Sequence, residues 1–223
     1  MATATVTQEQ RVTLHCVSWE AYVGIGEWLR EQPIRLTYSQ GSLEIMTLSL
    51  DHEQAKTLLA RMLETLTLEL NIDVKSGGST TCKREDLERG LEPDECYWIE
   101  HEPQMRSKSD YDPETDPPPD LAIEVEISRN VLNRLKIYAA LGIPEVWRYD
   151  GQAVQILLLG PKGEYQASST SKALPQVPVA ECARFLALRN NLSETQLIRQ
   201  FRDWVRQEAP GWAAKKPRAR KKK

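Results

Sequence analysis

Three acidic residues near the middle of the chain have a spacing that suits metal chemistry. Asp120, Glu124 and Glu126 lie in the string DLAIEVEI, whose apolar and β-branched residues predict a strand. Because side chains alternate along a strand, the three carboxylates share one face and repel one another unless water or a cation intervenes. A hard divalent cation such as Mg²⁺ prefers oxygen ligands of this kind. A strand with one face in water would show the same alternation, so periodicity alone leaves both interpretations open.

A fourth acid, Asp94, directly precedes a second predicted strand. It lies in Glu92-Pro-Asp-Glu95, ahead of the β-rich string CYWI, and Pro93 restricts the approach of the chain. The segment from Glu85 to Glu126 holds fifteen acidic and three basic residues. Acid-rich segments are most often solvated loops, so Asp94 by itself is a weak signal.

The elements that must position these acids follow from hydrophobic periodicity. Apolar residues at helical spacing predict a short helix after Ser18 and a long helix over about residues 52–70, capped by Asp51 with Gln54. Two more helices are predicted, one ending near Gly142 and one running from Ser193 to about residue 208.

Turn signals divide the predicted strands. Gln40-Gly41 and Asp150-Gly151 each separate two β-rich runs and predict hairpins. Short strands are expected after Asn71, and the polar, proline-rich segment 103–119 is expected to be a loop. The order of elements predicts an α/β fold with a mixed sheet, in which residues 121–149 form a strand–helix–strand crossover.

Charge divides the chain into two parts. Of 29 basic residues, seven lie among the last nine positions, and the rest of the chain has 22 basic and 32 acidic residues. We expect a polar lead-in over residues 1–12, a single domain over 13–208, and a disordered basic tail over 209–223. The tail suits a polyanion such as nucleic acid, although a solubilising terminus would have the same composition. Its basic residues are Lys215, Lys216, Arg218, Arg220, Lys221, Lys222 and Lys223.

Several classes of protein are disfavoured. The sequence has no run of about 18 to 20 apolar residues, which a membrane helix needs, and its first residues lack the features of a secretory signal. The four cysteines are far apart, which disfavours a zinc knuckle or a disulfide framework. We therefore expect a cytoplasmic protein with free thiols. With three histidines in all, the chain has little room for a zinc-dependent or serine hydrolase.

Three strings, taken together and in order, carry a resemblance to a known family. They are GLEPDECYWI, PPPDLAIEVEIS and NRLKIYAALGIPEVWRYDG, and the similarity runs from about Ile34 to Tyr165. The chain resembles the Uma family of restriction endonucleases, which is common in cyanobacteria and belongs to the PD-(D/E)XK nuclease superfamily. This resemblance implies a restriction-endonuclease-like core, with a central mixed β-sheet flanked by helices. It also implies hydrolysis of DNA phosphodiester bonds that depends on Mg²⁺ or Mn²⁺.

The resemblance also assigns candidate site residues. Asp94 matches the first acidic metal ligand, Glu124 the acid of the (D/E)XK strand, and Asp120 the second Pro-Asp pair. Glu126 stands where the superfamily motif has its lysine, and its carboxylate is a further candidate ligand. The family is similar to variants that place this lysine on the following helix, four residues before a tyrosine. Arg134 occupies that position here.

The identity of the catalytic cation stays open. Lys136 lies close to Arg134 but about 200° around a helix, so the two cannot face the same site. Arginine keeps the charge and can hold phosphate, but it cannot act as a neutral base. Glu53 is a further candidate, because nucleases of this superfamily often carry an acid on the first core helix. A first-turn acid favoured by the helix dipole is the alternative for Glu53, and a capping or packing role is the alternative for the neighbouring His52.

Two functions from different classes therefore remain. The first is a metal-dependent endonuclease that acts on DNA, and by analogy we expect a homodimer because cutting two strands needs two sites. The second is a weak or inactive relative that serves as a nucleic-acid-binding or protein-interaction module. The missing motif lysine favours the second. Tyr138 and Trp147 belong to the similar strings, but their apolar spacing predicts core residues.

Overall fold

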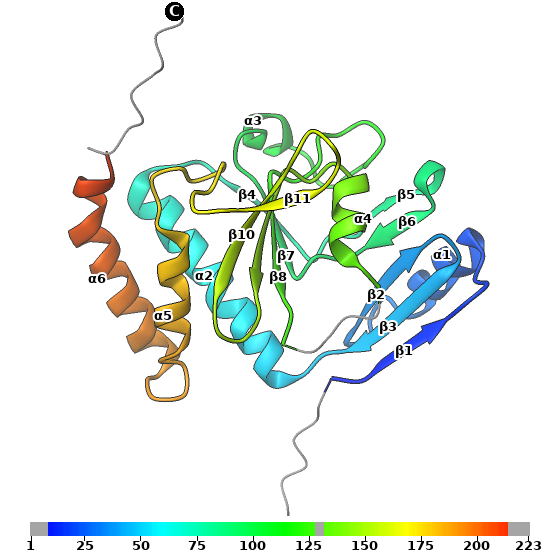
Figure 1. The fold of residues 1–223 in the computed structure, drawn as a ribbon, viewed down its shortest axis with the longest axis horizontal. Coiled ribbons are helices and arrows are strands. Elements are labelled where there is room, and N and C mark those ends of the chain that lie inside the picture. Colours follow the sequence, from blue (N-terminus) through cyan, green and yellow to red (C-terminus); the bar gives the residue numbers. More distant parts are fainter. Residues whose placement is uncertain (1–8, 128–131, 214–223) are drawn as a thin grey trace, which may run out of the picture.

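The computed structural model describes residues 9–127 and 132–213, which form two β-sheets with helices around them (Figure 1). The helices are α1 (Trp19–Trp28), α2 (Leu50–Leu70), α3 (Glu102–Met105), α4 (Arg134–Ala140), α5 (Cys182–Leu186) and α6 (Glu194–Ala213), with 3₁₀ turns at Glu85–Leu87 and Val179–Glu181. The strands are β1 (Arg11–Leu14), β2 (Ile34–Ser39), β3 (Ser42–Thr47), β4 (Lys75–Gly78), β5 (Cys82–Arg84), β6 (Arg89–Leu91), β7 (Glu95–Trp98), β8 (Leu121–Val125), β9 (Glu145–Tyr149), β10 (Val154–Leu159) and β11 (Tyr165–Ser168).

The two sheets differ in strand direction. The smaller sheet has the order β1-β3-β2-β6-β5 and all its pairs are antiparallel. The larger sheet has the order β11-β10-β9-β8-β7-β4, and β8 pairs with β9 in parallel while its other pairs are antiparallel. Because α4 connects the parallel pair, the predicted crossover over residues 121–149 is confirmed. The α/β class with a mixed sheet flanked by helices is also confirmed, whereas the sequence did not predict a separate antiparallel sheet.

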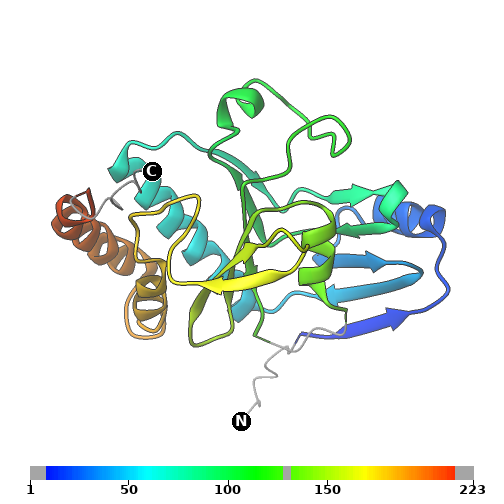
Figure 2. The same ribbon diagram turned by 45° about the horizontal axis from the view of Figure 1, so that its top comes forward.

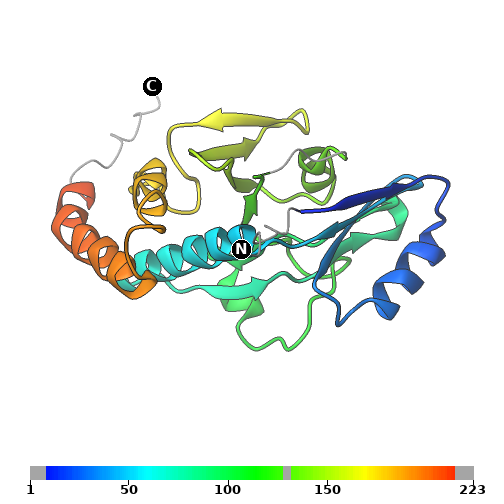
Figure 3. The same ribbon diagram turned by 90° about the horizontal axis from the view of Figure 1, so that it is seen from below.

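The core lies between the larger sheet and the helices α2, α5 and α6. The apolar stripe that predicted the long helix lies on the inner face of α2, which contacts β8 and α6. Five of its members are completely buried, and the last one, Leu70, is partly buried; the five are Leu58, Leu59, Met62, Leu63 and Leu66. Figures 1 and 3 show α5 and α6 together at one end of the molecule, with α1 and the smaller sheet at the other end. Helix α2 runs from the smaller sheet towards α6 and so links the two ends.

Helix starts differ from the prediction at two places. Ser49, rather than Asp51, caps α2, because its hydroxyl accepts the backbone N–H of His52 at 3.2 Å. The segment predicted to be a loop over residues 103–119 begins with the short helix α3, which projects from the body of the molecule in Figure 2. Four-residue helices carry too little periodicity to be predicted from spacing.

The expected lead-in and tail are both shorter than predicted. Strand β1 begins at Arg11 and pairs with β3, so the lead-in does not extend to residue 12. Helix α6 continues to Ala213, beyond the predicted end near residue 208, although Pro210 lies inside it. The tail residues 214–223 and residues 1–8 lie outside the described part of the chain.

Other predictions about the interior are confirmed. Tyr138 and Trp147 are completely buried, as their apolar spacing indicated. All four cysteines are free thiols, and three of them are buried. Within residues 9–127 and 132–213, no helix combines the length and the apolar character needed to cross a bilayer.

Candidate functional site

Asp94 and Glu124 come together from two neighbouring strands of the larger sheet. Strands β7 and β8 pair with Glu95 opposite Ile123, and one further residue along this register sets Asp94 opposite Glu124. The backbone N–H of Val125 donates to Asp94 Oδ2 at 2.7 Å, which holds the aspartate against the end of β8. Asp94 is 2% exposed and Glu124 is 5% exposed, so both carboxylates are inside the protein.

Helix α4 supplies the partners of Glu124. Arg134 forms an ion pair with Glu124 through Nε and donates from Nη2 to Oε2 at 2.9 Å. The Tyr138 hydroxyl donates to the same oxygen at 2.6 Å. Arg134 and Tyr138 are four residues apart, so one face of α4 delivers both side chains.

The guanidinium of Arg134 is also fixed from the opposite side. It donates to the Thr37 hydroxyl of β2 at 2.5 Å and to the backbone carbonyl of Glu92 at 2.7 Å. Arg134 therefore connects the smaller sheet to the larger sheet, and at 6% exposure it is nearly as buried as the carboxylate it contacts. Breaking a buried pair of this kind leaves an uncompensated charge inside the protein.

His52 holds the other carboxylate. Its Nε2 lies 2.9 Å from Asp94 Oδ1, and its Nδ1 lies 2.7 Å from Glu9 Oε1. The imidazole therefore bridges two acids, one before β1 and one before β7. We call Asp94, Glu124, Arg134, Tyr138 and His52 the carboxylate cluster.

The proton equilibria of the cluster follow from burial and from these contacts. Burial would lower the pKa of His52, but the hydrogen bonds and charges of Asp94 and Glu9 outweigh it and raise the pKa to about 10. Burial would raise the pKa of Asp94, but His52 and Arg134 hold it below its usual value. Burial raises the pKa of Glu124, and the nearby negative charge of Asp94 raises it further, whereas Arg134 opposes the shift. At neutral pH, protonated His52 and Arg134 therefore place positive charge beside Asp94 and Glu124.

Asp120 and Glu126 do not join the carboxylate cluster, so the structure does not bring the four predicted metal ligands together. Asp120 lies beyond the opposite end of β8, where it accepts the backbone N–H groups of Ile99 and His101 at 2.7 and 3.0 Å and pairs with the His101 ring Nδ1 at 2.6 Å. Glu126 is half-exposed and pairs with Arg148 at 3.5 Å. Alternation predicts which face of a strand a side chain occupies, but the two ends of β8 contact different parts of the protein.

Lys136 and Glu53 are also outside the cluster. Lys136 is exposed on α4, whereas Arg134 is buried and contacts Glu124. Glu53 lies next to His52 on α2, but its Oε2 accepts from Lys56 Nζ at 2.7 Å. The position of Glu53 one residue after His52 turns it to another face of the helix.

The donors at the cluster can be compared with the needs of a divalent cation. Mg²⁺ typically takes one or two protein carboxylates and keeps several waters, so Asp94 and Glu124 fit in kind and number. Three of the four carboxylate oxygens have a hydrogen-bond partner within the protein, the fourth lies in ion-pair contact with Arg134 Nε, and a metal would replace Arg134 on Glu124. Within the described ranges, no group of three or more His, Cys, Asp or Glu side chains is placed to hold a metal ion.

Sequence inspection missed several members of this site. Nothing in the sequence marks Thr37 as a site residue, because threonine is common on β-strands. The bridge from Glu9 through His52 joins residues 43 positions apart, and no local pattern reports such a distance. The role of Tyr138 could have been found, since its spacing from Arg134 places both on one helical face.

Comparisons with known proteins agree with the sequence motifs. The model of the Uma2 family, described as "Putative restriction endonuclease", matches residues 19–188. A solved structure described as "a putative nuclease belonging to DUF820", from Anabaena variabilis ATCC 29413, is 18% identical. The match covers 74% of this chain and 90% of that chain, with a TM-score of 0.43. No curated protein matches. The family match spans most of the described chain, including the whole carboxylate cluster, and this chain therefore belongs to the Uma2 family.

Proposed function

We propose that this chain is a DNA endonuclease whose activity depends on Mg²⁺ or Mn²⁺. The observation that carries the proposal is the meeting of Asp94 and Glu124 at neighbouring strand ends, with a cation from the crossover helix on Glu124. Membership in a family described as restriction endonucleases supports the same chemistry. Asp94 and Glu124 would hold the metal, and Arg134 would take the place of the motif lysine.

The chain's own residues would orient this chemistry. A bound Mg²⁺ supplies a Lewis acid that stabilises developing charge and lowers the pKa of bound water. His52 fixes the position of Asp94, and Tyr138 fixes the position of Glu124. Arg134 keeps its proton at any working pH, so it would contribute positive charge towards a phosphate rather than accept a proton from water.

The ion pair between Arg134 and Glu124 favours a second candidate function. A guanidinium that contacts both oxygens of Glu124 competes with any metal for that carboxylate. A relative that keeps this pair closed would bind nucleic acid or a protein without cutting. The two candidates differ in one measurable property, which is the affinity of the protein for Mn²⁺.

Cleavage assays with a conservative substitution separate the candidates. We expect purified protein to nick plasmid or single-stranded DNA with Mn²⁺ and not with EDTA, and Glu124→Gln to abolish the nicking. Arg134→Lys should raise the rate, because it restores the residue that the family resemblance implies. Lys162→Gln, on an exposed turn, is the matched control and should leave the rate unchanged. No cleavage by the wild type or by Arg134→Lys, with no Mn²⁺ binding by calorimetry, would overturn the enzyme proposal.

The basic tail and the oligomeric state extend this proposal. The seven basic residues from Lys215 to Lys223 lie outside the described residues, and we propose that they attract DNA electrostatically. Deleting them should weaken binding and flatten its salt dependence, and an unchanged salt titration would remove that role.

A homodimer is proposed because cutting both strands needs two sites, and light scattering of the purified protein tests it.

A further inference from the structure

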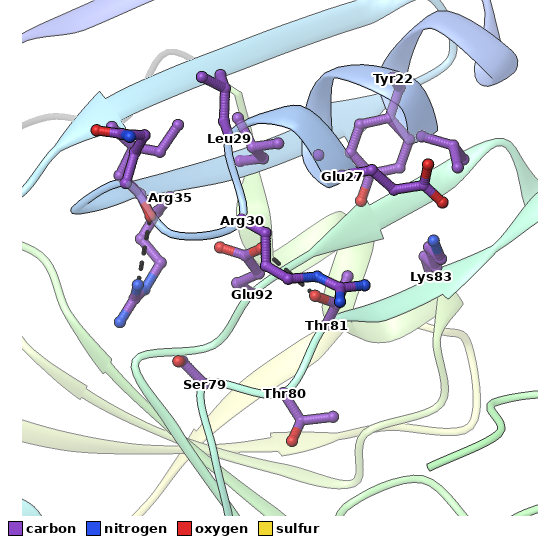
Figure 4. Close-up of a pocket in the computed structure, with 15 residues that line it drawn as sticks. Tyr22, Glu27, Leu29, Arg30, Arg35, Ser79, Thr80, Thr81, Lys83 and Glu92 are labelled. Carbon is purple, nitrogen blue, oxygen red and sulfur yellow. Dashed lines mark hydrogen bonds between the residues drawn. The ribbon is translucent and has the colours of Figure 1, made fainter. Parts of the chain in front are cut away.

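A polar pocket lies beside the carboxylate cluster, between α1, β2 and the segment before β5. Its volume is about 320 Å³, within the range of ligand-binding sites. Arg30, Arg35 and Lys83 line it together with Glu27 and Glu92. Figure 4 shows Arg30 extending over Glu92 and Thr81, with Glu27 and Lys83 on one side and Arg35 on the other. Ser79, Thr80 and Thr81 line its lower side in Figure 4, where the Thr80 hydroxyl donates to the Gly77 carbonyl at 2.5 Å and the Thr81 hydroxyl to Glu92 at 3.4 Å.

The cations of this pocket have spare hydrogen-bonding capacity. Among the described residues, the side chains of Arg30 and Lys83 have no hydrogen bond or ion pair. Arg35 donates only to the carbonyl of Ile34, at 3.3 Å, and its Nε is buried without a partner. Buried donors without partners are costly unless a ligand or water satisfies them. Arginine and lysine side chains that converge on one pocket are the donors that hold phosphate oxygens.

A large aromatic side chain lies in a hollow that adjoins this pocket. Trp28, the last residue of α1, is 87% exposed. It lines an adjoining hollow, which shares Glu27, Arg30 and Gln32 with the pocket. Most tryptophans are largely buried, so an exposed indole next to unpaired cations calls for a partner with a flat, apolar face.

The pocket also connects to the carboxylate cluster. The side chain of Glu92 lines the pocket, while its backbone carbonyl accepts from Arg134. On β2, Arg35 and Thr37 are two residues apart and share a face, and Thr37 also accepts from Arg134. A chain of phosphates held in the pocket would therefore continue towards Asp94 and Glu124.

We propose that this pocket binds an unpaired stretch of DNA, with a base stacked on Trp28 and phosphates held by Arg30, Arg35 and Lys83. The assignment rests on the proposed function and deepens it, because it makes single-stranded or locally unpaired DNA the preferred substrate. An exposed aromatic face stacks on an unpaired base, whereas the bases of a duplex are already stacked on one another. The carboxylates of Glu27 and Glu92 can accept base amino groups, which would favour cytosine or adenine.

Binding without cleavage tests the proposal separately from the nuclease activity. Fluorescence anisotropy of a labelled oligonucleotide of about ten nucleotides is measured with EDTA, for the full-length wild type and for variants. Trp28→Ala should weaken binding of the single strand by about 5- to 100-fold, and Trp28→Phe should retain most of it. Arg30→Gln should lower the slope of log affinity against log salt by about 0.7. Both positions are exposed, so these variants should fold.

Matched controls make the result decisive. Lys162→Gln and Leu68→Ala alter exposed residues elsewhere and should bind like the wild type. Equal affinity of Trp28→Ala and the wild type would overturn the proposal, as would an equal loss for duplex and single strand. Competition by thymidine monophosphate or inorganic phosphate at the oligonucleotide's own concentration would point to a small-molecule pocket and also overturn it. Because no metal is present, failure of this test leaves the cleavage test of Asp94 and Glu124 intact.

Discussion

The two ends of strand β8 carry the same kind of residue in two different environments. Asp120 and Glu124 are both buried acids on one face of the strand. Asp120 accepts hydrogen bonds from the backbone N–H groups of Ile99 and His101, and its Oδ1 lies 2.6 Å from the ring Nδ1 of His101, so it holds the loop after β7 onto the sheet. Glu124 accepts from the side chains of Arg134 and Tyr138. Four residues of a strand span roughly 13 Å, so sharing a face does not bring two side chains to one site.

The difference lies in how readily the partners of each carboxylate can move. The backbone N–H groups on Asp120 cannot leave unless the loop itself moves, and the same holds for the Val125 N–H on Asp94. Side-chain donors can leave Glu124 by changing rotamer, which makes room for a cation or a phosphate. If this contrast is correct, substitutions at the two ends of β8 and changes of pH should affect the stability and the activity of the protein differently.

The largest effect should come from removing the cation at the Glu124 end. Arg134→Met leaves Glu124 buried without its counter-charge and should lower the free energy of unfolding by about 3–5 kcal/mol. Replacing Glu124 with leucine in the same variant should recover much of this loss, because no unpaired charge remains. Urea denaturation measures both. A loss below about 1 kcal/mol for the single variant would show that the pair is open in solution.

The pH dependence of stability should report the His52 side of the cluster. The pKa of His52 is raised from 6.5 to about 10 in the folded protein, so its stabilising effect is complete below about pH 6.5 and is lost as the pH rises through about 10. We expect unfolding between pH 7 and 10 to become easier by on the order of a few kcal/mol. His52→Gln should flatten this slope. A slope that persists in His52→Gln would assign the dependence to another group.

The Asp120 end should give a smaller effect, and no effect on cleavage. Asp120→Ala leaves the N–H groups of Ile99 and His101 without their acceptor and should cost about 1–3 kcal/mol of stability. Asp120→Asn keeps one acceptor oxygen and should cost less. Cleavage rates measured well below the melting temperature should match the wild type. A loss of Mn²⁺ binding in Asp120→Asn would show that Asp120 contributes to the metal site.

The smallest effect should come from Glu126, just beyond the Glu124 end. Its ion pair with Arg148 is partly exposed and long, so Glu126→Gln should change stability by less than about 1 kcal/mol. Thermal denaturation at low and high salt measures the change. A larger effect would mean that Glu126 interacts with the cluster after all.

The sequence predicted elements better than it predicted contacts. The long helix α2 and the crossover through α4 were found because each repeats one local pattern over many residues. The separate antiparallel sheet was missed because strand partners are set by long-range packing, which alternation does not encode.

At the site, the similar strings pointed to Asp94, Glu124, Arg134 and Asp120, and the structure brings the first three together. Alternation grouped Asp120 and Glu126 with Glu124, but the structure places them apart, because alternation describes the face of a side chain and not its neighbours. The bridge made by His52 joins distant segments and could be seen only in the folded chain.

The position of α6 in the fold has a consequence for synthesis of the protein. Leu197, Phe201 and Val205 are completely buried against the core that α2 begins more than a hundred residues earlier. A nascent chain that has not reached this helix therefore exposes the apolar face of α2 while the sheet is already forming. Chains truncated before residue 194 should be recognised by chaperones or should aggregate, so completion of translation and completion of the core are coupled.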